Sequence, residues 1–419
     1  MRTLYSDTAE AAPATPPLAA NANADVVVIG AGYTGLSAAL HLAQDGASVM
    51  VLEAEEAGWG ASGRNGGQVN PGLKPDPDKV ESDFAGGLGE RMNALAGGAP
   101  SLVFDLIARH GIACEARRNG TLRAAVHPRH ATRLAALTDQ YRRRDAPVEL
   151  LRGAALEQAT GTGRYAAAMF DRRGGDLNPL GYARGLARAA LDAGAVVHGK
   201  SRAKRLVRHG SRWAVEAGTA RVNAAHVVLA TNGYTDDLWP ALRRSVVPVF
   251  GAIAATAPLP PALAKRILPG RPVLYESGTV TVYYRVDAAN RLLIGGRGPQ
   301  REIDNARAVP NLLAYAQRLW PDLKVTWTHG WGGRLAMSRD HYPHLHEPAP
   351  GLLACLAYNG RGIALATAMG RQIARRILQP GAAIDMPVTA VEPIALHALW
   401  PLAVHAAIAR GRVCDMLGL

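Results

Sequence analysis

Residues 25–54 read DVVVIGAGYTGLSAALHLAQDGASVMVLEA, and this stretch decides the fold. It opens with an unbroken apolar run, DVVVI, which is typical of a strand buried on both faces of a parallel sheet. Apolar residues then recur at helical spacing, at Leu36, Leu40 and Ala43, and Gly46 ends that helix in the usual C-terminal manner. A second apolar run, SVMVLEA, follows at once. The stretch therefore predicts a strand–helix–strand unit with a right-handed crossover.

Three glycines between the first strand and the helix form the pattern G-x-G-x-x-G. Gly30 permits a tight turn, Gly32 lets the backbone approach a pyrophosphate, and Gly35 allows close packing of helix on strand. The helix N-terminus offers unpaired N–H groups and a positive dipole end to the phosphates. Glu53, at the end of the second strand, would accept hydrogen bonds from a ribose diol and repel a 2′-phosphate, which disfavours NADP. A glycine-rich turn without a ligand is the alternative. The candidate dinucleotide-binding residues are Gly30, Gly32, Tyr33, Thr34, Gly35 and Glu53.

The motif alone does not separate FAD from NAD, because both carry the same pyrophosphate, ribose and adenine. Two further segments favour a flavin. Residues 58–69, GWGASGRNGGQV, follow the second strand closely, at the sheet edge where ligands of such folds bind. A glycine-dense loop there can press backbone N–H groups against a flat, electron-rich ring. VVLATNG, residues 227–233, is a buried strand that ends in a turn of small residues. A flexible linker is the alternative interpretation of the loop.

Bulk properties exclude several classes of protein. The chain has 419 residues, 48% of them hydrophobic, and 47 Lys and Arg against 34 Asp and Glu give a net charge of +13. The basic residues are scattered, and only QYRRRD at 140–145 resembles an RNA-binding tract, so we expect no nucleic acid partner. Three cysteines far apart predict neither a disulfide framework nor a cysteine zinc site. Without a secretory leader or an apolar run of about 18 residues, we expect a soluble cytoplasmic protein with no stable membrane insertion.

The order of elements predicts a discontinuous organisation. The fold class expected is α/β, with a Rossmann-type, glutathione-reductase-like FAD-binding domain and an inserted α+β substrate domain built on an antiparallel sheet. The expected divisions are an irregular N-terminal arm at 1–24, an FAD-binding domain at 25–75, 151–244 and 331–385, a substrate or cap domain at 76–150 and 245–330, and a C-terminal segment packed on the body at 386–419.

Three motifs carry a resemblance to a known family. GWGASGRNGGQV at 58–69, HGWGGRLAMSRDHYPHL at 329–345 and YNGRGIALATAMGR at 358–371 resemble the D-amino-acid oxidase-type family of FAD-dependent oxidoreductases. They are most similar to its branch of γ-glutamylputrescine oxidases and bacterial L-pipecolate oxidases. The resemblance spans nearly the whole chain, and the motifs identify the branch better than the substrate.

The resemblance implies a reaction and a set of cofactor contacts. It implies oxidation of a C–H bond beside an amine nitrogen, with hydride transfer to flavin N5, an imine product, and reoxidation by O2 to give hydrogen peroxide. A dehydrogenase of the same fold that passes electrons to a quinone or other acceptor is the alternative. The helix that begins near Gly362 would point at the N1/O2 edge of the flavin, where reduced flavin carries charge. The further cofactor residues implied are Ser62, Gly63, Arg64, Asn65, Gly66, Gly67, Gln68, Ala230, Thr231, Gly360, Arg361, Gly362 and Ile363.

The resemblance also implies substrate contacts. Arg334 matches a position at which relatives hold a substrate carboxylate, a task that suits the two-pronged guanidinium, although a surface ion pair is an equal alternative. Strand alternation would send Tyr283 and Arg285 to one face and Tyr284 to the other, so at least one tyrosine should reach the cavity, and Tyr283 and Arg285 are the candidate substrate residues of this strand. Trp331 could wall the same pocket. A small amine or amino/imino acid is the substrate expected, with its identity and stereochemistry undetermined.

Two absences complete the prediction. His341, His344 and His346 form no standard zinc spacing, and Pro343 interrupts them, so we expect no metal. In flavinylated relatives a cysteine lies just beyond the strand arginine, but Ala336, Met337 and Ser338 stand there in this chain. We therefore expect dissociable, non-covalent FAD.

Overall fold

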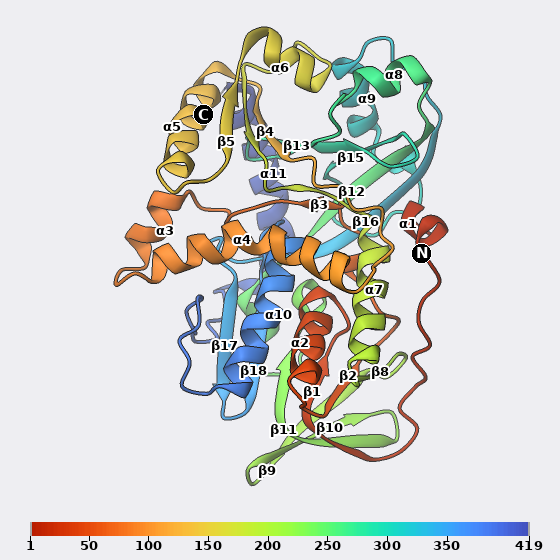
Figure 1. Cartoon of the computed structure of the whole chain (residues 1–419), viewed down its shortest axis with the longest axis vertical. Coiled ribbons are helices and arrows are strands. Elements are labelled where there is room, and N and C mark those ends of the chain that lie inside the picture. Colours follow the sequence, from red (N-terminus) through yellow and green to blue (C-terminus); the bar gives the residue numbers. More distant parts are fainter. Residues whose placement is uncertain (1, 418–419) are drawn as a thin grey trace.

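The structure is a computed structural model and describes residues 2–417. Two eight-stranded sheets, joined by a small two-stranded sheet, form its framework. In Figure 1 the first sheet and helices α2, α7 and α10 fill the lower half of the molecule, the second sheet fills the upper half, and α4 runs between them. The helices are α1 (Leu4–Thr8), α2 (Tyr33–Gln44), α3 (Pro77–Asp83), α4 (Leu88–Arg109), α5 (Pro128–Arg142), α6 (Gly153–Thr160), α7 (Pro179–Asp192), α8 (Pro261–Arg266), α9 (Pro310–Leu319), α10 (Gly362–Leu378) and α11 (Trp400–Leu417).

The first sheet is parallel at its centre. Its main path, in spatial order, is β17 (His344–Ala349), β18 (Leu352–Leu356), β11 (Ala220–Leu229), β1 (Ala22–Ile29), β2 (Val49–Leu52) and β8 (Val196–His198), with β9 (Ala203–His209) and β10 (Arg212–Ala217) attached to β11. The strands β18, β11, β1, β2 and β8 run parallel, whereas β17 and β10 pair antiparallel with their neighbours. The expected strand–helix–strand unit is thus β1–α2–β2, at the middle of the sheet.

Glycine is required where the unit is tightest. A side chain at Gly35 would place its Cβ 2.0 Å from the carbonyl oxygen of Gly30, so helix α2 could not lie this close to the turn before it. Gly30 itself has φ +104°, a conformation that favours glycine, and its own Cβ would meet the Ala230 carbonyl oxygen at 2.9 Å. The pattern that predicts this unit is therefore a steric requirement of the fold.

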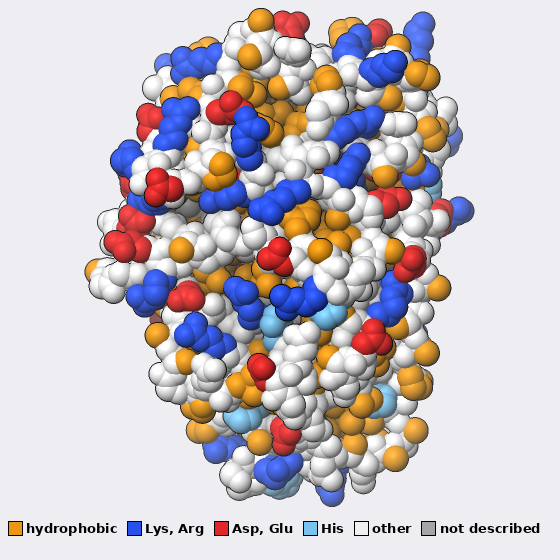
Figure 2. All heavy atoms as spheres, viewed as in Figure 1, with side chains coloured by type: hydrophobic (Ala, Val, Ile, Leu, Met, Phe, Trp, Pro, Cys, Tyr) orange, Lys and Arg blue, Asp and Glu red, His pale blue; other side chains and the backbone are white. Residues whose placement is uncertain are grey.

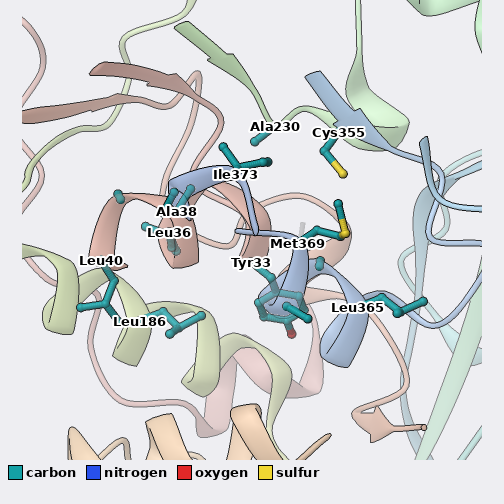
Figure 3. Close-up of a cluster of buried hydrophobic side chains, with 14 of the residues drawn as sticks. Tyr33, Leu36, Ala38, Leu40, Leu186, Ala230, Cys355, Leu365, Met369 and Ile373 are labelled. Carbon is teal, nitrogen blue, oxygen red and sulfur yellow. The ribbon is translucent and has the colours of Figure 1, made fainter. Parts of the chain in front are cut away.

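The largest hydrophobic core lies between the first sheet and its helices. Figure 3 shows side chains of α2, α7 and α10 in this core, with Leu36 and Leu186 on one side and Met369 directed toward Cys355 on the other. Helices α2 and α10 cross closely because Gly370 has no side chain; a Cβ there would lie 2.6 Å from the Ser37 Cβ. Each fully buried leucine contributes roughly 2 kcal/mol through removal of apolar area from water. This core fixes the N-termini of α2 and α10 against the end of the sheet.

The second sheet is mostly antiparallel. In spatial order it contains β16 (Trp327–Met337), β12 (Val247–Pro258), β15 (Arg291–Arg297), β14 (Tyr283–Val286), β13 (Val273–Glu276), β4 (Thr121–Ala125), β6 (Ala167–Asp171) and β5 (Val148–Leu151). One pair, β13 with β4, is parallel. Strands β3 (Gln68–Val69) and β7 (Gly175–Asp176) form the small sheet between the two halves. The α/β class with a Rossmann-type unit and a second, antiparallel sheet is confirmed.

Strand pairing departs from the expected segment bounds. Strand β6 pairs with β4 and β16 pairs with β12, so both belong to the second sheet, whereas the sequence-based bounds placed residues 151–171 and 331–337 with the first. Helix α4, expected in the cap, packs into the first core through Met92 and Val103. A local pattern identifies a strand or a helix, but its partner is set by tertiary register. The division into two domains stays a prediction.

The N-terminal arm contains more order than an irregular segment. Helix α1 lies within it, and Tyr5 is fully buried with its ring 5.1 Å from Trp331 in an edge-to-face contact. Residues 9–21 then run across the surface, held by contacts such as the backbone hydrogen bond from Gly199 N to Thr15 O at 3.1 Å. The low periodicity of the segment concealed α1, because a helix of five residues gives almost no pattern.

Candidate active site

A cavity of about 1020 Å³ lies between the two sheets. The last residues of three strands of the first sheet, Ile29, Leu52 and Leu229, line one end of it. Side chains of the second sheet, of α5 and of α11 line the other end. The carboxyl edge of a doubly wound sheet is where such folds bind ligands. The cavity is therefore the candidate active site.

The N-terminus of α2 forms the phosphate-binding geometry that a dinucleotide needs. Gly32 caps the helix without a side-chain hydrogen bond, and a Cβ on it would lie 2.9 Å from Ser62 Oγ in the cavity wall. Ser62 Oγ also accepts a hydrogen bond from Tyr33 N at 3.1 Å. The positive helix end thus faces the cavity at a turn where a side chain on Gly32 would crowd Ser62. This is an anion site of the kind that binds a pyrophosphate.

Glu53 lies where a ribose would be recognised. Its carboxylate lines the cavity and accepts backbone hydrogen bonds from Ala31 N at 2.7 Å and Glu55 N at 2.9 Å. Burial raises the pKa of Glu53 above its usual range, although these backbone donors lower it. A carboxylate has about four lone-pair sites, so acceptors remain for the two hydroxyls of a ribose. The residues present therefore fit the adenosine half of FAD.

The loop at 58–69 is a fixed structure. Asn65 Nδ2 donates to Ser62 O at 2.9 Å and to Ala61 O at 3.1 Å, and Asn65 Oδ1 accepts from Gly67 N at 2.9 Å. These bonds fold the loop around its own asparagine, so the linker interpretation is wrong. Gly66 lies against Tyr283, and a Cβ on it would meet that ring at 2.6 Å. The loop thereby joins the first sheet to the wall of the second.

Most of the cofactor residues expected from the sequence line the cavity together. These are Gly30, Gly32, Tyr33, Thr34, Glu53, Ser62, Arg64, Asn65, Gly66, Gln68, Ala230, Thr231, Gly360, Arg361, Gly362 and Ile363. Gly35, Gly63 and Gly67 lie behind the wall, where a Cβ would meet the carbonyl oxygens of Gly30, Gly58 and Leu177. These three shape the backbone that carries the others. Whether each lining residue contacts the cofactor stays a prediction.

Arg361 and the start of α10 form the wall opposite α2. The Arg361 guanidinium is buried and donates to Pro71 O and, at 3.0 Å, to the hydroxyl of Tyr275. Helix α10 begins at the next residue, Gly362, so its N–H groups also face the cavity. A helix N-terminus and a buried cation together favour negative charge at this position.

Three of the four expected substrate contacts do not reach the cavity. Arg285 donates from Nε to Gly66 O and from Nη1 to Asp176 Oδ2, both at 2.8 Å, within the core. Trp331 is fully buried and donates from Nε1 to Arg64 O at 3.0 Å. Arg285 and Trp331 thus bind the backbone of the loop at 58–69 on its side away from the cavity. Only Tyr283 lines the cavity, while Tyr284 packs edge-to-face on Trp320 in the core on the other face of the sheet.

Among the described residues, Arg334 neither lines the cavity nor forms a surface ion pair. Its guanidinium lies 4.5 Å from the ring centre of Tyr234, and Tyr234 is the side chain that lines the cavity. Within residues 2–417 the Nε atom of Arg334 is buried without a hydrogen-bond partner, and no carboxylate pairs with this side chain. Its flanking residues Gly333 and Leu335 line the cavity instead, since alternate residues of a strand face opposite ways.

Arg297 is a cavity residue that the sequence analysis missed. It ends β15 two residues after Gly295, which pairs with Tyr283 on the neighbouring strand. Gly295 has no side chain, and a Cβ there would lie 2.3 Å from the Tyr283 ring, so the ring lies across it and Arg297 reaches the cavity beyond. Burial lowers the pKa of Arg297. The sequence feature that could have indicated Arg297 is the pattern GGR at 295–297, on a strand that pairs with the aromatic residue Tyr283.

Lys74 is a second missed residue. It lines the cavity just after the loop and is exposed there; desolvation by the cavity wall, followed by the charges of Arg123, Arg361 and Arg297, lowers its pKa to about 8. Asp76 is the nearby carboxylate that opposes this shift. An ammonium group in this cavity therefore loses its proton more readily than in water.

Other groups lie apart from this chemistry. His341 lines the cavity, but His344 pairs with Asp340 at 3.0 Å, and His346 contacts Thr389 O at 2.8 Å. Within residues 2–417, no cluster of His, Cys, Asp and Glu could hold a metal ion. None of the three cysteines of this range lines the cavity. Among the helices described, none combines the length and apolar composition needed to cross a bilayer.

Comparison with known proteins gives consistent results. A family model described as FAD dependent oxidoreductase matches residues 25–376. The chain is 30% identical over 385 residues to the probable oxidoreductase OrdL of Haemophilus influenzae, covering 90% of this chain and 88% of that protein. It is 32% identical over 356 residues to the gamma-glutamylputrescine oxidoreductase of Escherichia coli, covering 84% and 82%.

Solved structures share the fold. Glycine oxidase from Geobacillus kaustophilus superposes with a TM-score of 0.72 at 24% sequence identity, covering 87% of this chain and 97% of that one. Iminodiacetate oxidase from Chelativorans superposes with a TM-score of 0.69 at 20% identity, covering 88% and 98%.

Proposed function

Because the chain belongs to the FAD dependent oxidoreductase (DAO) family, and is an FAD-dependent oxidoreductase, we propose that it oxidises a small amine or amino/imino acid to the imine. FAD, when bound, would accept the hydride at N5 and return the electrons to O2 as hydrogen peroxide. The relatives that act on such substrates support the proposal at the level of the family. The single observation that carries it is a cation-rich cavity at the N-termini of α2 and α10.

The chain offers a separate contact for each part of FAD. The N-terminus of α2 would bind the pyrophosphate, Glu53 the ribose, and the loop at 58–69 with residues 360–363 the flavin. In this proposal the segments of the first sheet are the FAD-binding domain and those of the second sheet cap the substrate. The cysteines lie away from the cavity within the described residues, which supports FAD that dissociates.

We assign the substrate carboxylate to Arg297. Its guanidinium lines the cavity beside Tyr283, whereas Arg334 lies behind Tyr234. A planar, two-pronged donor suits a carboxylate, and a partly buried one gains most from an anionic partner. The position expected from the family resemblance is thus replaced by another arginine on a neighbouring part of the same sheet.

The positive charges of the cavity would also favour the neutral form of the substrate amine. A hydride donor must be the neutral amine, so the site has to favour loss of the ammonium proton. The lowered pKa of Lys74 reports what this environment does to an ammonium group. Arg297 and Arg361 would act on a bound substrate ammonium in the same direction.

The test is peroxide formation by the purified protein with a panel of amines, imino acids and both amino-acid enantiomers. Oxidation of a carboxylated amine with a matched yield of peroxide would support the proposal. Reduction of a quinone or dye without O2 uptake would favour the dehydrogenase instead. Arg297→Met should raise KM for that substrate, and Arg334→Met is the matched control that should leave KM unchanged.

A further inference from the structure

The cavity contains more positive charge than the proposed reaction uses. Arg361 lies at the start of α10 on Tyr275, and Arg297 is assigned to the substrate carboxylate. Three lining cations, Lys74, Arg123 and Arg133, have neither a role in that scheme nor a close ion pair among the described residues. Arg133 is exposed on α5, whereas Lys74 and Arg123 come from the segment before α3 and from strand β4. In Figure 2 Lys and Arg side chains also gather across the middle of the face shown, at the level between the two sheets.

Neither Lys74 nor Arg123 is neutralised by the protein. Lys74 forms no hydrogen bond and no ion pair with any residue of the range 2–417. Arg123 donates from Nε to Ser277 Oγ at 3.2 Å and approaches Asp76 Oδ1 only at 3.9 Å. Asp76 is itself about half exposed, with 47% of its side chain accessible, so its charge is well screened. Among residues 2–417, Asp76 is thus the one carboxylate in ion-pair contact with Arg123, and Lys74 has none.

Two further acids of the cavity, Asp340 and Asp415, are already engaged. Asp340 accepts hydrogen bonds from Tyr342 N at 3.0 Å and is paired with His344. Asp415 accepts from the backbone N–H groups of Thr279 and Val280 at 2.7 and 2.8 Å. Neither carboxylate pairs with Lys74 or Arg123. Lys74 is exposed at the cavity and Arg123 keeps 21% of its side chain accessible, so an anionic ligand there would supply a counter-charge that the protein does not.

We propose that Lys74 and Arg123 form a second anion site, so that the substrate carries two carboxylates in addition to its amine. One carboxylate binds Arg297 and the other binds between Lys74 and Arg123, on the side of the cavity toward α5. This inference rests on the proposed function and specifies its substrate class. The two residues determine specificity and take no part in the transfer of hydride.

A second carboxylate on the substrate would use these two cations. A monocarboxylate bound at Arg297 would leave Lys74 and Arg123 without a ligand partner. A dicarboxylate supplies one anion for each end, with charge-assisted hydrogen bonds at both. Recognition of two carboxylates at a fixed separation also discriminates against shorter acids, because these cannot reach both sites.

The test measures binding without turnover. Glutarate and valerate, which have five carbons each and differ by one carboxylate, are titrated into the FAD-loaded protein, and the visible absorbance of the flavin reports occupancy. We expect glutarate to bind tighter than valerate on the order of tenfold to a hundredfold, the range of one charge-assisted hydrogen bond. Lys74→Met and Arg123→Met should each reduce glutarate affinity toward that of valerate and leave valerate affinity in place.

Matched variants separate charge from shape. Lys74→Arg retains the cation and should retain the preference for glutarate. Lys79→Met removes a cation that also lines the cavity but already pairs with Asp83 at 2.9 Å, and it should have no effect. Arg297→Met should weaken both ligands equally.

The outcomes distinguish this inference from the proposed function. Equal affinity for the two acids in the native protein, or equal loss of both in Lys74→Met, overturns the second anion site while leaving amine oxidation to its own assay. Failure of both acids to change the flavin spectrum overturns the second anion site together with the role of Arg297. Peroxide formation with an amine dicarboxylate at a higher kcat/KM than with its monocarboxylate counterpart supports it.

Discussion

Replacing Arg285 by methionine should destabilise the fold while leaving substrate recognition intact. Arg285 is 4% exposed and joins three segments: it donates to Gly66 O in the loop, to Asp176 in β7, and, at 3.5 Å, to the hydroxyl of Tyr5 in α1. Methionine fills much of the same volume and makes none of these bonds. The strand pattern predicted a substrate contact at this position, so the variant separates a structural role from a catalytic one.

The expected loss of folding free energy depends on the hydrogen bonds that Asp176 keeps in the variant. Removing one partner of a buried ion pair costs about 3–5 kcal/mol. Asp176 keeps a two-pronged contact with Arg117, at 3.1 and 2.7 Å, so we expect the lower end, about 3 kcal/mol. At roughly 2 °C per kcal/mol for a large chain, the melting temperature should fall by about 6 °C.

Thermal unfolding monitored by the release of flavin fluorescence measures this directly. Arg291→Met is the matched control, because Arg291 lies on the adjacent strand and pairs with Asp287 at 3.2 Å with its side chain 23% exposed. Its melting temperature should fall by less, about 2 °C, because Asp287, although buried, keeps its hydrogen bond from the backbone N–H of residue 291 at 2.8 Å. An Arg285→Met protein that melts normally but shows a raised KM would refute this assignment and restore Arg285 to the substrate.

Three further outcomes are expected. Gly35→Ala should yield a colourless protein, because a Cβ 2.0 Å from Gly30 O displaces α2 from the phosphate site, and the ratio of flavin to protein absorbance measures the loss. Acid precipitation should leave the flavin in the supernatant, and a yellow pellet would contradict dissociable FAD. Glutarate affinity should fall as pH rises through about 8, because deprotonated Lys74 no longer carries a charge, while valerate affinity measured by the same titration stays level.

The sequence was most informative where structure depends on neighbours along the chain. The unit β1–α2–β2 could be predicted because Gly30 and Gly35 are sterically required within six residues of each other, and Glu53 follows at the next strand end. The loop at 58–69 could be placed at the cavity because it follows β2 at the carboxyl edge of the sheet. Each of these inferences used local geometry alone.

The substrate wall could not be predicted for a physical reason. Alternation correctly separates Tyr283 from Tyr284, but it does not reveal which face of a strand meets the cavity until its sheet partners are known. Arg334 and Arg297 both lie on strands of the second sheet, and the pairing of Gly295 opposite Tyr283 brings only the second of them to the cavity. Lys74 gave no signal, since a lone lysine after a loop is ordinary surface composition.

The burial of α1 has a consequence for how the protein is made. Tyr5 packs on Trp331, which is synthesised 326 residues later, as the difference 331 − 5 shows. At translation speeds of about 5–20 residues per second, Trp331 is synthesised roughly 20–60 s after Tyr5. The back of the loop therefore cannot close during most of synthesis, and a nascent chain should capture its flavin only after β16 has left the ribosome.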